Sequence, residues 1–295
     1  NVGWIGQFVA RELNGELQNI DENFSIEDRE IQLLIGVEEL DSGDLYLATE
    51  DGKSTILSQD YEKMLVADVI DDNIRWYTLG SFLVQKPQDD DVNDNTKFQS
   101  MDYTIKFNRR FDYTFKNSRY TKSFEEELLS NGYVTAKWLA DYVCEQVGVP
   151  FMTYRFTNDN YRVISNQFVN NESCREVMKA IAQLAYGWVE VDWDDCCYIR
   201  ELNTELGEIP EHNIIDNNHY YSLVTQSKYF GPINRVIVAM ENVDGEGAQI
   251  EDPQSIEEFG LTELYVYDNP LTYLSEQRVD VVRNATHLLG LGYKP

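Results

Sequence analysis

One acidic loop has the ligand spacing of a calcium site. The residues with that spacing are Asp91, Asn93 and Asn95 at the first three ligand positions and Asp102 at the twelfth. Thr96 replaces the glycine that such a site requires, and aspartate is a poorer bidentate twelfth ligand than glutamate. A solvated acidic hairpin tip over residues 89–95 is therefore the primary interpretation, and calcium binding is the alternative.

The cysteines and histidines do not form a recognisable site. The four cysteines, which lack C-x-x-C spacing, are Cys144, Cys174, Cys196 and Cys197. We expect buried free thiols, with a zinc site as the minor alternative, because four cysteines give no disulfide framework in a chain of this size. The histidines are His212, His219 and His287, each expected to be solvated or to lie at a helix end.

Motifs of the common enzyme classes are absent. The sequence contains no G-x-S-x-G, H-E-x-x-H, Walker loop or dinucleotide-binding fingerprint. A carboxylate pair for glycoside hydrolysis stays open, because the separation of such a pair is a three-dimensional quantity. We therefore predict that the chain is not an enzyme, and assign no catalytic, cofactor-binding or metal-binding residue and no cofactor.

A basic and aromatic stretch runs against the acidic balance of the chain. Residues 106–122, KFNRRFDYTFKNSRYTK, hold six basic residues and one acid. The aromatic residues between them are Phe107, Phe111, Tyr113, Phe115 and Tyr120. This pattern is used in binding of single-stranded nucleic acid, but the overall charge opposes it. The stretch indicates either an interface with an acidic patch of a neighbouring subunit or ordinary strands with solvated Lys and Arg.

Acidic residues dominate the composition. The chain has 52 acidic and 24 basic residues and a net charge of -28, so its surface repels nucleic acid and anionic membranes. No apolar run is long enough to span a membrane. Residues 241–258 contain no Lys or Arg and are expected to form a solvated face, with a negative channel wall or contact with a basic partner as alternatives.

The most legible structural unit is a helix followed by a β-hairpin over residues 170–202. Asn171 is the expected N-cap, apolar residues then recur at helical spacing, and Gly187 is expected to adopt the left-handed C-cap conformation. Two strands with period-two alternation follow and are joined by a turn at Asp194 and Asp195. We expect this unit to be structural packing.

The other patterns give a mainly β, α+β chain with three parts. Residues 1–108 predict short strands of a barrel or sandwich, including 31–37, 76–84 and a strand pair near 98–107. Residues 109–204 predict a mixed α/β domain, with a first helix over 134–147 that ends at Gly148. Residues 205–295 predict a β-rich domain with strands at 235–240 and 263–267 and a last helix over 274–289.

Several stretches, in order, resemble the tail-hub or tail-associated structural proteins of long-tailed bacteriophages, especially of the prophage type found in Gram-positive hosts. The resembling stretches are GSFLV at 80–84, FQSMDYTIKF at 98–107, NNESCR at 170–175, GPINRV at 231–236, GLTE at 260–263 and DNP at 268–270. The resemblance spans roughly residues 20–293, while the first 19 residues match less well.

The resemblance implies a baseplate hub at the tail tip. Members of that family form trimeric rings of tube-forming β-barrel domains with a smaller α/β domain inserted, and the last barrel is expected to continue beyond Pro295. The implied partners are further copies of the chain, a distal tail or tail-tube protein and the tape-measure protein, with indirect contact to the host surface. DNA is expected to pass through the ring without specific binding.

Two other function classes remain open at this point. One is a cell-wall hydrolase that uses paired carboxylates. The other is a host-surface carbohydrate-binding module, for which the 19 Tyr and 5 Trp would supply stacking platforms.

Overall fold

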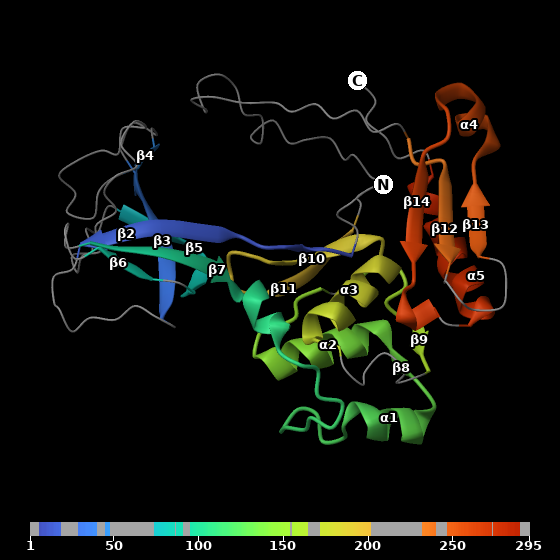
Figure 1. Cartoon of the computed structure of the whole chain (residues 1–295), viewed down its shortest axis with the longest axis horizontal. Helices are drawn as coiled ribbons and strands as arrows, with labels where there is room; N and C mark the ends of the chain where they lie inside the picture. The colour runs from blue at the N-terminus through green and yellow to red at the C-terminus, as the bar shows by residue number, and fades with distance from the viewer. Residues whose placement is uncertain are drawn as a thin grey trace.

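The computed structural model describes residues 6–18, 29–39, 45–47, 74–85, 87–90, 95–153, 155–164, 172–201, 232–239, 247–272 and 274–289. These residues form an α+β structure with four β-sheets, arranged as a β-sheet unit, a central mixed unit and a C-terminal α/β unit (Figure 1). The expected α+β class is confirmed for this part of the chain.

The first unit is an antiparallel sheet, drawn in blue and teal in Figure 1. Its strands, in spatial order, are β2 (Glu12–Gln18), β7 (Asn95–Asp102), β5 (Ile74–Val84), β3 (Glu30–Glu39) and β4 (Leu45–Leu47), with β6 (Gln88–Asp90) also paired to β7. The expected strands at 31–37 and 76–84 are confirmed. The described strands form an open sheet, so the expected closed barrel is not present in this part of the structure.

One local expectation in this sheet is confirmed and one is wrong. Residues 88–90 form β6 and pair antiparallel with residues 95–97, so the expected acidic hairpin is present, and its tip at 91–94 lies outside the described residues. The expected strand near residue 107 is instead a 3₁₀ helix, η1 (Tyr103–Asn108), because the Asp102 carboxylate caps it by accepting a hydrogen bond from the Thr104 backbone N–H at 3.1 Å.

The mixed unit has three helices and a small sheet. Its helices are α1 (Phe124–Asn131), α2 (Ala136–Val147) and α3 (Cys174–Leu184). Its strands are β1 (Phe8–Val9), β10 (Gly187–Val191) and β11 (Cys197–Glu201) in one sheet, and the short pair β8 (Val134–Thr135) and β9 (Arg162–Val163). The sheet order β1-β10-β11 places the first strand of the chain in this unit, parallel to β10. The helix predicted at 134–147 is confirmed, and Gly148 ends it in a left-handed conformation.

The helix and hairpin at 172–201 are confirmed, but both expected caps are wrong. Ser173 caps α3 by accepting a hydrogen bond from the Glu176 backbone N–H at 3.2 Å, while Asn171 lies outside the described residues. The left-handed residue after α3 is Tyr186, with φ of 53°, and not Gly187. A Cβ on Gly187 would lie 2.0 Å from the backbone oxygen of Arg200, so this glycine is required by the close approach of β11.

The C-terminal unit packs a helix against one face of a three-stranded sheet. The sheet has the order β13 (Ala248–Glu251), β12 (Arg235–Ala239), β14 (Glu263–Tyr267), and α4 (Pro253–Phe259) connects its outer strands. Three short helices follow: η3 (Pro270–Thr272), α5 (Ser275–Arg283) and η4 (Asn284–Leu288). The strands predicted at 235–240 and 263–267 are confirmed, whereas the predicted last helix is divided between α5 and η4.

One hydrophobic core runs through the mixed and C-terminal units. It includes Leu139, Ile181 and Val189 of the mixed unit together with Val236 and Val281 of the C-terminal unit, and all five are buried. The two units therefore pack together as one body.

Gly187→Ala should destabilise the protein by at least about 2 kcal/mol, because the new methyl group would overlap the backbone of β11. The control is Gly132→Ala at the C-cap of α1, where a Cβ has open space and only the positive φ of 77° is strained. Chemical denaturation should give a smaller loss, about 1 kcal/mol, for this control. Equal losses for the two variants would contradict the role assigned to Gly187.

Candidate functional site

The main polar site of the described structure is the junction between the first sheet and the mixed unit, and Arg11 lies at its centre. The Arg11 backbone N–H donates to the Asp102 carboxylate at 2.9 Å, and its guanidinium forms an ion pair with the same oxygen at 3.3 Å. The guanidinium also donates to the backbone oxygens of Leu79 at 2.8 Å and Asp192 at 2.9 Å. Arg11 therefore links three segments that are far apart in the sequence.

The local backbone of β5 makes room for this arginine. Gly80 has φ of 113°, opposite an irregularity in the β3–β5 register between Leu33 and Leu34. A Cβ at Gly80 would lie 2.9 Å from a guanidinium nitrogen of Arg11. A glycine is thus needed both for the backbone conformation and for the close approach of Arg11.

The hairpin tip of the mixed unit supplies a second link. The Asp195 carboxylate accepts hydrogen bonds from the Ser81 backbone N–H at 2.8 Å and from its hydroxyl at 2.7 Å. Asp195 itself has φ of 59° and ends a turn in which its backbone N–H donates to the Asp192 backbone oxygen at 2.9 Å, so the turn expected at Asp194 and Asp195 is confirmed. The carboxylate at this position gives the turn a second role as a contact with the first sheet.

An aromatic residue and a lysine lie beside this junction. The Lys106 ammonium lies 3.1 Å from the centroid of the Tyr103 ring, a cation–π contact. Burial and a hydrogen bond with Glu30 raise the pKa of Tyr103 to about 12, and burial lowers the pKa of Lys106. Tyr103 is therefore uncharged at neutral pH, and both groups pack around the junction.

The calcium hypothesis fails at its twelfth ligand. Asp102 is fully buried and its two carboxylate oxygens are engaged by Arg11 and by the backbone and hydroxyl of Thr104. Asp91 and Asn93 lie outside the described residues, and Asn95 is the first residue of β7. Within the described ranges, no group of three or more His, Cys, Asp or Glu side chains is arranged to hold a metal ion.

The basic and aromatic stretch at 106–122 packs against α2 and has a structural role. Phe107, Phe111 and Tyr120 are buried, so they are not available as stacking platforms. The Tyr142 hydroxyl of α2 donates to the backbone oxygen of Phe115 at 2.7 Å. The Gln146 side chain of α2 makes two hydrogen bonds, each 2.9 Å, with the backbone of Asp112. Side chains of α2 therefore hold the loop in place.

Two of the six cations of this stretch, Lys116 and Arg119, form ion pairs with carboxylates of α1 and α2. Lys116 pairs with Glu126 of α1 at 2.5 Å. Arg119 pairs with Asp141 at 2.5 Å and with Glu145 at 3.3 Å, both on α2. Residues 109–123 lie outside helices and strands apart from an isolated bridge at Arg110, so the expectation of ordinary strands is wrong. The buried rings and the two paired cations give no support to an interface or a nucleic-acid site at this place.

The cysteines behave as core residues. All four are free and buried, as expected. Burial raises the pKa of Cys174 to about 12 and that of Cys196 to about 11, and it also raises the pKa of Cys144. These thiols are therefore protonated at neutral pH and lack the thiolate that nucleophilic or metal-binding cysteines require.

The structure describes some of the remaining predicted residues, which are the histidines and the acidic tract at 241–258. His287 is exposed at the end of η4, near the backbone oxygen of Asn284 at 2.8 Å, which agrees with the expected position at a helix end. His212 and His219 lie outside the described residues. In the acidic tract, Glu251 pairs with Arg235 at 2.9 Å and Asp252 caps α4, so part of this tract is structural.

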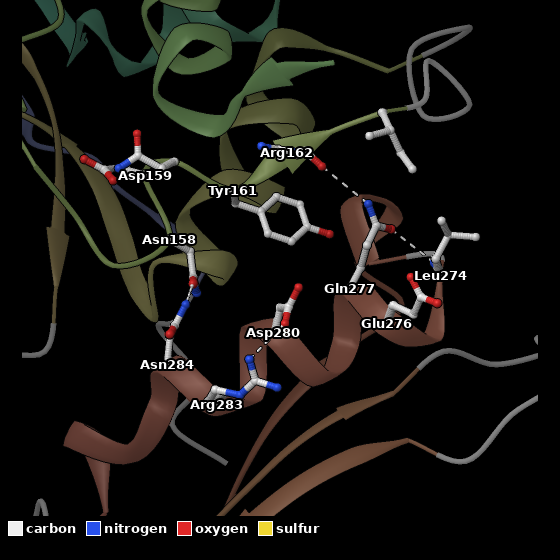
Figure 2. Close-up of a pocket in the computed structure, with 12 residues that line it drawn as sticks. Asn158, Asp159, Tyr161, Arg162, Leu274, Glu276, Gln277, Asp280, Arg283 and Asn284 are labelled. Atoms are coloured by element: carbon white, nitrogen blue, oxygen red, sulfur yellow. Dashed lines mark hydrogen bonds and ion pairs between the residues drawn. The ribbon is translucent and has the colours of Figure 1, made fainter. Parts of the chain in front are cut away.

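A polar groove lies between residues 158–164 and one face of α5, with a volume of about 560 Å³ (Figure 2). Its walls are joined by a hydrogen bond from Gln277 to the backbone oxygen of Arg162 at 3.4 Å and by a hydrogen bond between Asn284 and Asn158. Asp280 points toward the groove and pairs with Arg283 at 3.3 Å. Among the described residues, the lining contains amide, carboxylate and guanidinium groups but no His, Cys or Ser, so these residues offer hydrogen bonds and no nucleophile of the serine or cysteine type.

Sequence reasoning did not single out Arg11, Ser81 and Asp195 as a connected group. Asp102 and Gly80 were noticed for other reasons, as a calcium ligand and as part of a resembling stretch. A positive-φ position and a buried charge pair leave little trace in a single sequence, because both depend on contacts between distant segments.

Arg11→Met should destabilise the protein by about 3 kcal/mol, because it leaves the buried Asp102 carboxylate without its counter-ion. The double variant Arg11→Met/Asp102→Asn should recover part of this loss, since no uncompensated charge is then buried. The control is Lys97→Met, an exposed lysine 4.0 Å from Glu16, which should stay within about 0.5 kcal/mol of the wild type. Denaturation midpoints measure the stability of all three variants. If Arg11→Met were as stable as the wild type, the central role assigned to Arg11 would be contradicted.

Tyr142 should make the protein less stable in strong alkali. Burial raises its pKa to about 12, whereas an unfolded tyrosine titrates at about 10. Between these values the unfolded chain binds fewer protons, so the free energy of unfolding falls as pH rises from 10 towards 12. In Tyr142→Phe this fall should be smaller, while from pH 7 to 9 variant and wild type should show the same pH dependence. If the free energy of unfolding fell equally steeply above pH 10 in the variant and the wild type, the raised pKa of Tyr142 would be contradicted.

No family model matches the chain, and no curated protein matches it. Two solved structures to which the chain is similar are the 43 kDa tail protein of prophage MuSo2 from Shewanella oneidensis and the prophage tail protein gp18 from Listeria monocytogenes EGD-e. The first is 12% identical with a TM-score of 0.34, and the alignment covers 95% of this chain and 72% of that one. The second is 12% identical with a TM-score of 0.41, covering 92% and 76%. Neither TM-score is high enough to establish a shared fold.

Proposed function

We propose that this chain is a structural component of a bacteriophage tail, which forms a hub ring, trimeric as in the family it resembles, at the tail tip. The proposal has two supports. The first is the ordered set of resembling stretches in the sequence. The second is the place that those stretches take in the fold, and this second observation carries the argument.

The first two resembling stretches contribute to the Arg11 junction. Gly80 and Ser81 belong to GSFLV, and Asp102 belongs to FQSMDYTIKF. Through these residues the first sheet contacts Arg11 and the hairpin tip at Asp195. Their role in the described structure is to fix one unit against another.

The remaining resembling stretches also make hydrogen bonds with distant segments of the chain. Arg175 of NNESCR donates to the backbone oxygen of Thr104 at 2.8 Å, which ties α3 to η1. Asn234 of GPINRV is buried and exchanges hydrogen bonds with the GLTE segment at 2.7 and 2.8 Å. Asn269 of DNP, also buried, donates to the backbone oxygen of Ala180 in α3 at 2.7 Å. The residues that carry the resemblance therefore make structural hydrogen bonds, between units at Asn269 and the Arg11 junction and within one unit at Arg175 and Asn234, which favours an architectural role over a catalytic one.

Ring formation is tested by native mass measured across protein concentration at moderate salt. We expect a species of three times the 34.3 kDa chain mass, and rings with a central opening in electron micrographs. Tails assembled with an epitope-tagged chain should carry the label at one end of the tail. A strict monomer that also fails to assemble with a tail-tube protein would overturn the proposal.

A second measurement separates the rival classes. The purified chain should neither cleave peptidoglycan nor bind host-wall glycans, because the proposed role is assembly. Cleavage would favour a hydrolase, and specific glycan binding that is lost on mutation of the groove in Figure 2, for example Gln277→Ala with Asp280→Ala, would favour a carbohydrate-binding module.

A further inference from the structure

We propose that the outer face of the C-terminal sheet is a docking surface for an extended, basic polypeptide segment of another protein. The surface is formed by β12, β13 and β14 on the side away from α5. It goes beyond the hub assignment, because it names a surface and a partner chemistry that hold whether or not the chain forms rings.

Strand register shows which side chains belong to this face. Val236, Val238, Leu264 and Val266 are buried and belong to the core that α5 covers. Their neighbours along the strands point to the opposite side, because side chains alternate along a strand. The cross-strand pairs Ile237–Tyr265 and Arg235–Glu263 therefore lie on the outer face.

The apolar part of this face is exposed. Tyr265 is 46% exposed, and Leu261, two positions before the first residue of β14, is 50% exposed. Phe259, at the end of α4 before this strand, is 52% exposed. Of these three residues Tyr265 belongs to β14, and Leu261 and Phe259 lie just before this strand in the chain. Exposed aromatic and aliphatic side chains that are so close in the sequence are typical of interaction sites, since single scattered ones are the norm elsewhere.

The charge of the surface selects the partner. Residues 248–267 contain no Lys or Arg, and their carboxylates are Glu251, Asp252, Glu257, Glu258 and Glu263. The one arginine on this face, Arg235, is already shared by Glu251 and Glu263 at 2.9 Å each. A second copy of a chain with net charge -28 would be repelled here, whereas a segment with Lys or Arg between apolar residues would be attracted.

The position of β14 gives the binding geometry. In the order β13-β12-β14 it is one of the two outer strands among the described residues, β13 being the other. An extended segment can add to such an edge by main-chain hydrogen bonds while alternate side chains contact the exposed face. Some of the basic side chains would then lie near Glu263 of the strand.

The test uses three synthetic peptides of roughly ten residues, long enough to pair with one strand. One alternates Lys and Val, one alternates Lys and Ser with the same charge, and one alternates Glu and Val. Fluorescence anisotropy at moderate salt should show the Lys–Val peptide binding at least about tenfold more tightly than the other two, because it alone offers both charge and apolar contact. Amide hydrogen exchange should show protection of residues 263–267 on binding.

Two variants locate the site. Leu261→Ser/Tyr265→Ser should weaken binding of the Lys–Val peptide at least about tenfold. The matched control is Leu129→Ser with Glu125→Gln and Glu127→Gln on α1, where an 81% exposed leucine also lies among carboxylates, and it should leave binding unchanged. The substituted residues are exposed except Glu127, which is half-buried, and circular dichroism checks that both variants are folded.

Three results would overturn the proposal: equal binding of the Lys–Ser peptide, equal loss in the α1 control, or no protection of β14. None of these bears on ring formation, which the native mass decides separately. Conversely, a chain that stays monomeric, fails to assemble with a tail-tube protein and still binds the Lys–Val peptide at β14 would overturn the hub proposal and leave this docking surface in place.

Discussion

The position of the first sheet depends on one buried charge pair. Arg11 and Asp102 stand at the two points where the chain enters and leaves that sheet, and each also reaches outside it. Because Asp102 is fully buried, its charge requires the arginine, and the arginine in turn requires Gly80 to leave space. The direct contacts at this junction are polar: the guanidinium group to Asp192 and the Asp195 carboxylate to Ser81. Directional contacts of this kind define an orientation more sharply than apolar packing alone would.

The mixed and C-terminal units depend on a different kind of contact. Their core is continuous, and Tyr186 shows how it is joined: its buried ring lies in the mixed unit while its hydroxyl donates to the backbone oxygen of Val281 in α5 at 2.7 Å. The positive φ of Tyr186 is unfavourable for a residue with a large side chain. The contact with α5 explains why tyrosine, and not glycine, occupies this position.

Patterns that are local in sequence were read correctly. Strands β3, β5, β12 and β14 and helices α2 and α3 follow from periodicity, because each buries one face and shows this as a repeat. The failures concern residues whose role is set by distant partners. Gly187 looked like a helix cap but serves the approach of Arg200, and Asp102 looked like a metal ligand but pairs with Arg11.

The stretch at 106–122 failed for the same reason. Its basic and aromatic residues are adjacent in sequence, but the fold turns the aromatic rings inward and brings carboxylates of α1 and α2 to several of the cations. A composition signal of this kind measures what a segment contains and not which side of it faces solvent. The acidic tract at 241–258 differs from this stretch in the number of opposite charges around it. Few cations lie in the neighbouring sequence or on the same sheet, where Arg235 pairs with Glu251.

Strand β1 has a consequence for the connectivity of the chain. Because β1 pairs with β10, the mixed unit begins at residue 8, leaves for the six-stranded sheet, and resumes at η1. The sheet is thus a long excursion from the mixed unit, and its two ends meet: the Asp102 backbone N–H donates to the Arg11 backbone oxygen at 3.1 Å. Because the two ends of this inserted segment are hydrogen-bonded to each other, a segment of very different length could replace it without moving the residues on either side. Cutting the chain before η1, in contrast, would remove an edge strand from the unit that it was meant to isolate.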